Sequence, residues 1–469
     1  MIFWVGFVLR VAAILIGHTY RIRVPDHHFG FGWEMGRIAQ SLVLGQGYAN
    51  PFNGPSGPTA WTPPLYPLLI ALSFKLFGIY TNAAALFLMV CDSVFSAAIA
   101  PAVFEIAARC FDQHSVARRT GRFFGRQTAT PVALWAAWLW AVYPAALQYA
   151  VHWIWEMSLS AMLFTWIFVL ALRLRGVGDG CAARESQTPG AKAQISSDAM
   201  RPERPKAEAS GYLEVSRKLE APVIGRWVWF GVLWGLLALS NASLLLCFPA
   251  MVAWIAWPKL SDKARWSRLI GGAAFSVAAF ALVMTPWVAR NEHTLHALVL
   301  TLSNFGVELY ASSLESHDAF PWGTAMPLWA GDPEFKRYVR MGEIQYSKVR
   351  GQEAMARLRV RKLQFAKWTL DRFLFFWDGT PHTLENHPAQ EYLRETSYAF
   401  LSLCGLLGLG LMLRRRVPGA GLFLLAFLLV PLPYYLITVQ ARFRHPIEPL
   451  ICVLGVYLFR CTEVRRRVA

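Results

Sequence analysis

Long apolar runs are the feature that most restricts what this chain can fold into. A run of about 20 residues can cross the roughly 30 Å hydrocarbon core of a bilayer as a helix. Backbone groups in lipid must satisfy their own hydrogen bonds, and the absence of strict alternation favours helices over a closed barrel. Hydrophobic residues make up 55% of the sequence and charged residues 16%. The sequence therefore predicts an all-α, polytopic membrane protein with about ten transmembrane helices, at 2–17, 82–108, 129–147, 153–172, 227–240, 243–257, 269–288, 396–413, 419–437 and 446–460.

The distribution of positive charge predicts the orientation of these spans. The net charge is +17, and 26 of the 46 Lys and Arg residues fall in the segments that are cytoplasmic if the N-terminus is cytoplasmic. Short cytoplasmic loops carry an excess of Lys and Arg, whereas long translocated loops are largely exempt. Both termini are therefore expected in the cytoplasm. The basicity is explained by topology, so no nucleic-acid partner is predicted.

Three regions follow from the spans. Residues 1–288 form an N-terminal transmembrane region with an outside loop at 18–65 and a compositionally disordered cytoplasmic loop at 176–222. Residues 289–395 form a small helical outside domain, with amphipathic helices expected over 334–377. Residues 396–469 carry the last three spans.

Two short segments near the N-terminus also carry expectations. "WEMGRIAQSLVLG" predicts a loop helix that stops at Gly45, and residues 64–78 are too short to span, so they are expected to be interfacial or re-entrant.

Arg10 lies within the first, uncleaved span, where it is expected to snorkel toward the cytoplasm unless the natural start lies upstream. No cysteine lies in an outside segment, so no disulfide framework is implied.

The first outside loop contains two candidate catalytic acids. Asp26 and Glu34 are the only acids in residues 1–91, and both follow the first span directly. A carboxylate at the membrane surface can act as a general base toward an acceptor hydroxyl. Together with His27 and His28 these acids could instead hold a metal ion, or the loop could simply be solvated, with an acid capping its helix.

Two further outside segments carry cations. "QARFRHPIEPL" places Arg442, Arg444 and His445 at the entry to the last span, and arginine is well suited to phosphate because it is planar and permanently charged. Interfacial anchoring would explain the same residues. "TPWVARN" contributes Arg290 and Asn291, which could equally cap the outside domain.

Inside the spans, Asp92 is the one acid near the middle of a predicted helix. An intramembrane acid is a functional hypothesis by default, although packing against a polar partner explains it equally well. The sequence contains no Walker A loop, HExxH, GxSxG or cysteine-pair metal motif, so ATP bound by this chain is not the predicted energy source.

Several of these segments, in this order, resemble the GT-C superfamily of glycosyltransferases that use lipid-linked sugars. The similarity is strongest to bacterial proteins of glycosyltransferase family 39, the protein-mannosyltransferase and aminoarabinose-transferase type. It covers nearly the whole chain and rests on "EMGRIAQSLVLGQGYANPF", "TPPLYPLLIALSFKLFG", "TPWVARN", "NFGVELYAS" and "RFRHPIEP".

The resemblance implies a function and a set of site residues. A sugar would pass from a polyprenyl-phosphate donor to an acceptor hydroxyl on the outer face of the bacterial inner membrane, with inversion. The family's Asp-Glu pair is absent here, so the implied base is either Asp26 or Glu34. The implied phosphate-binding and supporting residues are Arg442, Arg444, Arg290, His445, Asn291 and Tyr66.

The resemblance leaves the sugar and the acceptor open, and the acceptor could be a protein, a lipid or a glycan. No cofactor is certain, although a divalent metal remains compatible with the family. The competing functions are a transporter or flippase of lipid-linked saccharides, which would need polar residues along the spans, and a non-catalytic membrane scaffold.

Overall fold

The computed structural model describes residues 1–22, 30–111, 131–178, 224–257, 263–314, 326–380 and 388–466. In these ranges the regular structure is helical, and the extended pairing is limited to two isolated bridges, Ala49 with Pro58 and Asn53 with Trp329. The predicted all-α class is therefore confirmed for the part of the chain that is described. Asp26, His27 and His28 lie outside it.

The helices of the N-terminal half form a bundle around one large apolar core. One member of this bundle is a helix at Ile224–Ala238. Its other members are α1 (Ile2–Gly17), α4 (Leu65–Phe77), α5 (Asn82–Ala97), α6 (Ile99–Phe111), α7 (Pro131–Val142), α8 (Pro144–Val151), α9 (Met157–Arg175), η4 (Ala242–Leu246) and α12 (Cys247–Ala256). The loop helix α3 (Glu34–Val43) packs against α4. Gly45 follows it with φ +77°, a conformation that suits glycine and ends the helix as predicted.

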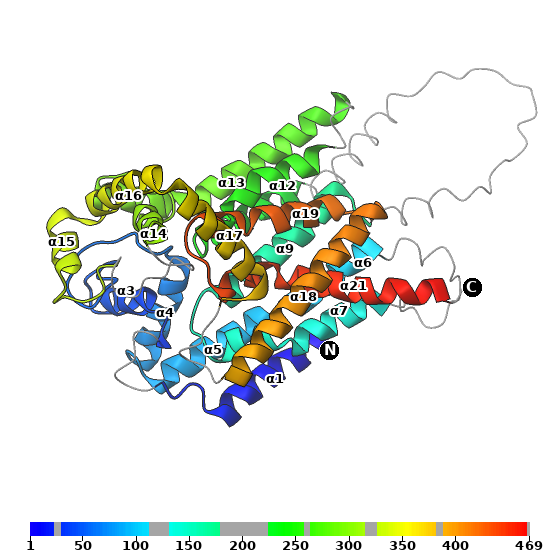
Figure 1. The fold of residues 1–469 in the computed structure, drawn as a ribbon, viewed down its shortest axis with the longest axis horizontal. Helices are drawn as coiled ribbons and strands as arrows, with labels where there is room; N and C mark the ends of the chain where they lie inside the picture. Colours follow the sequence, from blue (N-terminus) through cyan, green and yellow to red (C-terminus); the bar gives the residue numbers. More distant parts are fainter. Residues whose placement is uncertain are drawn as a thin grey trace, which may run out of the picture.

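The C-terminal half supplies the outer helices and the last helices of the bundle. They are α13 (Lys263–Leu295), α14 (Phe305–Ser312), α15 (Pro333–Met341), α16 (Glu343–Val360), α17 (Lys362–Asp378), α18 (Pro388–Arg414), α19 (Ala420–Leu429), α20 (Leu432–Leu436), η6 (Ala441–Ile447) and α21 (Glu448–Arg466). The amphipathic helices expected over 334–377 correspond to α15, α16 and α17. Helices α3, α14, α15 and α16 gather at one end of the molecule, while the C-terminus lies at the other end (Figure 1).

Four helices among the described residues are long and apolar enough to cross a membrane, judged by length and composition: Asn82–Phe111, Met157–Arg175, Leu269–Leu295 and Tyr392–Arg414. Other predicted spans correspond to shorter apolar helices. Two of those runs are interrupted: α7 ends before the helix restarts at Pro144, and α19 ends before the helix restarts at Leu432. Proline is well tolerated in the first turn of a helix, because its missing N–H would have no partner within the helix there. Further along a helix it removes a hydrogen bond to the preceding turn, so a continuous helix ends before it. Residues 64–78 form a 13-residue helix, which agrees with the expectation that they are too short to span.

The outer helices are fastened to the first loop by one buried carboxylate. Glu343, at the start of α16, accepts hydrogen bonds from the Ala60 backbone N–H (2.6 Å), the Ser303 hydroxyl (2.6 Å) and the Tyr338 hydroxyl (2.7 Å), and also from Thr59. Its side chain is 5% exposed. These bonds tie three separate segments together at the end of the bundle that carries α3.

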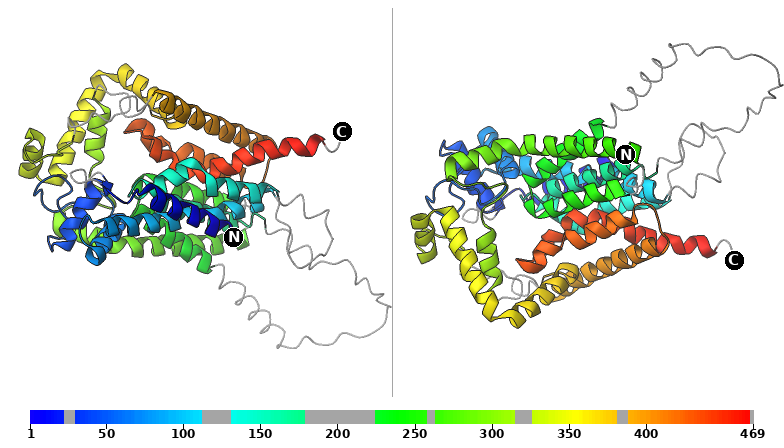
Figure 2. Two further views of the ribbon diagram at one scale, coloured as in Figure 1. Left: turned by 90° about the horizontal axis from the view of Figure 1, so that it is seen from below. Right: turned by 90° about the horizontal axis from the view of Figure 1, so that it is seen from above.

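Close packing also constrains this end. A Cβ atom on Gly306 of α14 would lie 1.9 Å from the Ser347 carbonyl oxygen of α16, so only glycine permits the two helices to approach this closely. Views from below and above place α14, α15 and α16 beside the first-loop segments (Figure 2).

Arg10 does not snorkel, contrary to the expectation from its position. It is fully buried, and its guanidinium donates to the Ser96 hydroxyl (3.0 Å) and to the carbonyls of Gly6 (2.9 Å) and Ala141 (3.0 Å). The break between α7 and α8 leaves the Ala141 carbonyl available as an acceptor. The cation is therefore satisfied inside the bundle.

Candidate functional site

The end of the bundle that carries α3 contains a cavity of about 500 Å³. It is bordered by α3, the segment 61–63, the start of α9, the turn at 240–243, α14 and the segment 433–443, which runs from α20 to η6. Its volume is in the range of small-molecule and cofactor sites. Segments far apart in the sequence therefore converge on one concave site.

Within the described part of the chain, four charged side chains line this cavity: Glu34, Glu156, Glu308 and Arg442. Its other walls are mostly apolar and aromatic, including Trp61 and Tyr434. Mostly apolar walls with a few convergent charges are typical of a ligand site. Of the sequence candidates among the described residues, Glu34 and Arg442 are the two brought together here.

Glu34 is the first residue of α3, and the structure shows it partly buried at the cavity wall. Burial raises the pKa of its carboxyl from about 4.5 to about 7, although its own backbone N–H and the Arg442 guanidinium act in the opposite direction. No hydrogen bond or ion pair joins Glu34 to another described side chain. A carboxylate with a pKa near neutrality and a free face toward a cavity can accept a proton from a bound hydroxyl.

Arg442 enters the cavity from η6. Its guanidinium carbon lies 3.7 Å from the ring centroid of Trp155 and 5.3 Å from that of Phe443, so the group stacks between aromatic walls. Within the described part of the chain it makes no hydrogen bond or ion pair. Its donors remain available to a ligand, and a planar guanidinium matches the oxygen geometry of a phosphate.

Glu156 and Glu308 complete the charged lining, and neither was predicted as a site residue. Glu308 accepts hydrogen bonds from Thr438 (2.8 Å) and Asn304 (3.4 Å), and burial raises the pKa of its carboxyl. Glu156 precedes α9. The sequence signal was present in "WIWEMS" and "NFGVELY", each with an acid beside an apolar run, but it did not show that both acids face Glu34.

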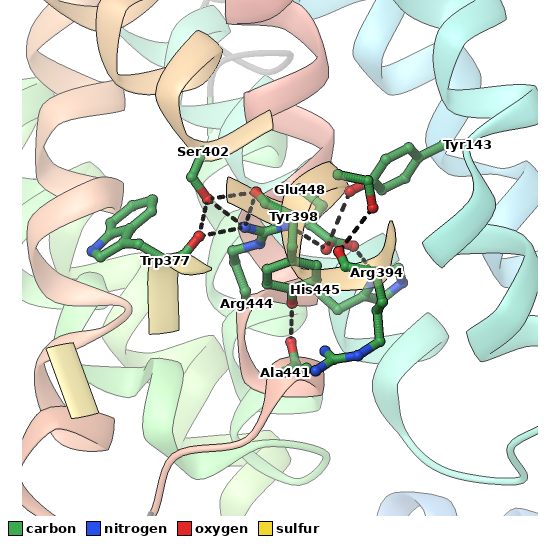
Figure 3. Close-up of polar contacts among 10 residues, drawn as sticks. Tyr143, Trp377, Arg394, Tyr398, Ser402, Ala441, Arg444, His445 and Glu448 are labelled. Atoms are coloured by element: carbon green, nitrogen blue, oxygen red, sulfur yellow. Dashed lines mark hydrogen bonds and ion pairs between the residues drawn. The ribbon is translucent and has the colours of Figure 1, made fainter. Parts of the chain in front are cut away.

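Arg444 lies elsewhere, although it is two residues from Arg442 in the same short helix. It is fully buried, and it donates to the carbonyls of Trp377 (3.3 Å) and Tyr398 (3.2 Å), to Ser402, and to the Glu448 carboxylate (3.4 Å) (Figure 3). It is absent from the lining of the cavity. Its role in this structure is to fasten η6 to α17, α18 and α21.

His445 belongs to the same buried cluster. Its Nδ1 lies 2.6 Å from Glu448 Oε2 (Figure 3). The centroid of its ring lies 5.6 Å from that of Trp140 and 4.7 Å from that of Tyr149. Tyr143 adds a weaker hydrogen bond to Glu448 at 3.4 Å. We name Arg444, His445, Glu448 and Ser402 the anchor cluster; it holds the backbone from which Arg442 projects.

The remaining sequence candidates also have internal partners. Arg290 donates to the carbonyls of Thr59 (2.6 Å) and Tyr48 (2.6 Å), and the Asn291 amide donates to the Val299 carbonyl (3.0 Å). These bonds hold the first loop against α13. Neither residue lines the cavity that contains Glu34.

Tyr66 and Asp92 form a pair within the bundle. The Tyr66 hydroxyl donates to Asp92 Oδ2 at 2.7 Å, and both side chains are buried. Asp92 thus has the polar packing partner that the sequence allowed as an alternative to a proton relay. Tyr66 is not part of the cavity lining.

A metal site was compatible with the sequence. Among the described residues, no group of three or more His, Cys, Asp or Glu side chains is arranged to hold a metal ion. Asp26, His27 and His28 are outside those residues.

The sequence matches no protein-family model and no curated protein. The structure is similar to the oligosaccharyltransferase of Archaeoglobus fulgidus, solved with a tethered acceptor peptide, with a TM-score of 0.50 and 14% identity; the match covers 98% of this chain and 50% of that one. It also matches ArnT from Cupriavidus metallidurans bound to undecaprenyl phosphate, with a TM-score of 0.38, 15% identity, and 96% and 77% of the two chains covered.

This chain spans about half the length of the oligosaccharyltransferase. At this level of identity the likeness concerns the fold. It confirms at that level the fold that the sequence resemblance implied.

Proposed function

We propose that this chain is an integral-membrane glycosyltransferase that moves a sugar from a polyprenyl-phosphate donor to an acceptor hydroxyl. The observation that carries the proposal is that Glu34 and Arg442 line one cavity, each with a face that no other described side chain occupies. The shared fold and the sequence motifs support the same reaction class. The oligosaccharyltransferase of similar fold was solved with an acceptor peptide, and we extend acceptor binding by analogy to this chain.

The proposed reaction is a single displacement with inversion. The acceptor hydroxyl loses its proton to the Glu34 carboxylate, and its oxygen attacks the anomeric carbon. The bond between that carbon and the phosphate oxygen breaks, and polyprenyl phosphate leaves with the electron pair. Arg442 stabilises the negative charge that grows on the phosphate.

Asp26 remains the competing base, because it lies in the same loop but outside the described residues. Glu308 and Glu156 are proposed to contribute to the electrostatic potential around Arg442 rather than to take part in the reaction. The lipid-phosphate contacts are assigned to Arg442, because Arg444 and Arg290 already donate to acceptors within the protein. His445, Asn291 and Tyr66 are proposed to support the fold.

The membrane arrangement belongs to the same proposal. It comprises about ten spans, both termini in the cytoplasm of a bacterial cell, and the cavity at the outer face. The four long apolar helices and the position of α3 and α14–α16 opposite the C-terminus support it (Figure 1).

Purified protein given a radiolabelled polyprenyl-phosphate sugar tests the function. We expect release or transfer of the sugar, with loss of the lipid-linked form. A flippase or transporter would move the intact lipid-linked saccharide in proteoliposomes without breaking the bond, and a scaffold would do neither. Either outcome would contradict the proposal.

A further inference from the structure

A second pocket, of about 540 Å³, lies along α3 beside the cavity that contains Glu34. Arg37, Gln40 and Ser41 of α3 form one wall, and Asn53 and Tyr80 contribute to the others. We name it the α3 pocket. Among the described residues that line it, none is acidic and Arg37 is the one with a charged side chain.

Arg37 is exceptional among the buried arginines of the described chain. Its side chain is 8% exposed, its buried Nη1 has no hydrogen-bond partner among the described residues, and its guanidinium carbon lies 6.0 Å from the ring centroid of Trp33. The other arginines buried below one-tenth exposure all donate to protein oxygens: Arg10, Arg350, Arg372 and Arg444.

A buried cation of this kind lowers the stability of the folded protein. A buried charge without a compensating partner destabilises the structure by several kcal/mol, and pairing with an anion offsets much of that penalty. Burial accordingly lowers the pKa of the Arg37 guanidinium, although Glu34 and Tyr80 oppose the shift. An arginine of this kind is suited to an anionic ligand that arrives from outside.

The other residues that line the α3 pocket indicate that the uncharged part of the ligand is polar rather than apolar. Gln40 and Asn53 offer amides and Ser41 a hydroxyl, which exchange hydrogen bonds with sugar hydroxyls, and Tyr80 offers an aromatic wall. Asn50, by contrast, is committed to the loop: it donates to Ser41 and Gln46 and accepts from two backbone N–H groups.

The α3 pocket is adjacent to the proposed base. Glu34 and Arg37 are three residues apart on one helix, which corresponds to about 4.5 Å along its axis. The Arg37 guanidinium lies over the ring of Trp33, and Trp33 also lines the cavity. A molecule seated in the α3 pocket would therefore extend toward Glu34 past Trp33.

We propose that the α3 pocket binds an anionic saccharide unit of the acceptor, with its phosphate or carboxylate on Arg37 and a hydroxyl directed toward Glu34. The inference rests on the proposed transferase function, since it identifies the pocket's occupant as the acceptor.

The test uses purified full-length protein and three soluble probes: glucose 6-phosphate, glucuronate and glucose. We expect at least one charged sugar to bind and to raise the melting temperature, and neutral glucose to bind at least about 10-fold more weakly, because it lacks the charge-assisted hydrogen bonds to Arg37. A preference between the charged probes identifies phosphate or carboxylate as the natural group.

Variants assign the site. Arg37→Gln should weaken binding of the charged sugar by about 10-fold or more, whereas Arg442→Gln, in the neighbouring cavity, should leave it within about 2-fold. Arg21→Gln is the matched control, an exposed arginine near the first loop that is not part of the α3 pocket. If Arg37→Gln does not fold, Gln40→Ala should show a smaller loss in the same direction.

Three results would overturn the inference: no binding of any charged probe, equal binding of glucose, or binding that is lost in Arg442→Gln and retained in Arg37→Gln. Release or transfer of the sugar from a polyprenyl-phosphate donor is measured separately. Breakdown of the donor without charged-sugar binding would refute the pocket's assignment alone, and absence of both release and transfer would refute the transferase.

Discussion

Arg442 and Arg444 share one short helix, yet their surroundings are opposite. Arg444 is fully buried and donates to two carbonyls, a serine and a glutamate of the surrounding helices. Arg442 stacks on Trp155, and its hydrogen-bond donors face a cavity. A buried charge whose terminal nitrogens all donate to protein oxygens contributes to one fixed structure, whereas one with vacant donors beside a cavity is available for a ligand.

The same contrast separates two glutamates. Glu343 accepts four hydrogen bonds from the first loop and the outer helices and has no vacant face. Glu34, at the start of α3, has none from another described side chain, and its pKa is raised to about 7. Satisfied carboxylates hold the end of the bundle together, and the unsatisfied one faces the site.

The largest expected effect is on Glu34. Glu34→Gln removes the proposed base while keeping the side-chain volume, so we expect turnover to fall by roughly 10²- to 10⁴-fold. Sugar transfer from a radiolabelled donor measures it, with an unchanged melting temperature or higher as the sign of an intact fold. Asp26→Asn is the matched control; if it abolishes transfer while Glu34→Gln is fully active, Asp26 is the base.

The arginine pair gives the next largest effect. Arg442→Gln should lower turnover by roughly 10²-fold, the order seen for removal of one group that stabilises an oxyanion, without changing the melting temperature. Arg444→Gln should instead lower the melting temperature and the yield of folded protein. The comparison between the two arginines fails if both variants lose stability equally, or if Arg444→Gln is stable and inactive.

The anchor cluster predicts a loss of stability when its carboxylate is removed. Glu448→Gln leaves the buried Arg444 without its counter-charge, which we expect to cost roughly 3 kcal/mol. Denaturation in mild detergent measures it. Glu353→Gln is the control: Glu353 on α16 is 35% exposed and pairs with Arg337 of α15 and Arg350 of α16, and we expect its loss to cost less than about 1 kcal/mol.

The raised pKa of Glu34 predicts opposite pH dependences for turnover and for the stability of the folded protein. The base must be ionised, so turnover should rise as pH increases through about 7. The folded protein binds this proton more tightly than the unfolded chain, so the contribution of Glu34 to stability falls between about pH 4.5 and 7. Glu34→Gln should therefore flatten the stability profile in that range. A pH–rate profile with no inflection near 7 would contradict the assignment.

The smallest effect is expected at the aromatic wall. Trp155→Leu removes the ring on which Arg442 stacks, an interaction of about 0.5–2 kcal/mol. We expect KM for the donor to rise by roughly 3- to 30-fold with little change in kcat. Trp153→Leu, two residues before Trp155 and outside the cavity lining, serves as the control and should leave KM within about 2-fold.

Periodicity and turn residues were sufficient to predict much of this fold. The loop helix that ends before Gly45 and the amphipathic helices of 334–377 were predicted from hydrophobic spacing and glycine. The breaks before Pro144 and Leu432 were missed, because a continuous apolar run conceals where a helix restarts.

The site was predicted only in part. Arg442 and Arg444 are indistinguishable by residue type and neighbourhood, and only the turn of η6 directs one into the cavity and the other into the anchor cluster. Glu156 and Glu308 could not be joined to Glu34, because they lie more than 100 residues apart in the sequence. Arg10 was predicted to snorkel because its acceptor, the Ala141 carbonyl, arises from an unpredicted helix break.

A structure of the protein with polyprenyl phosphate bound tests the central claim most directly. We predict that the phosphate lies in the cavity within hydrogen-bond distance of the Arg442 guanidinium, on the side that Glu34 faces, while Arg444 keeps its contacts to Trp377, Tyr398, Ser402 and Glu448. A phosphate bound instead at Arg444 or Arg290, with the cavity around Glu34 unoccupied, would contradict the account.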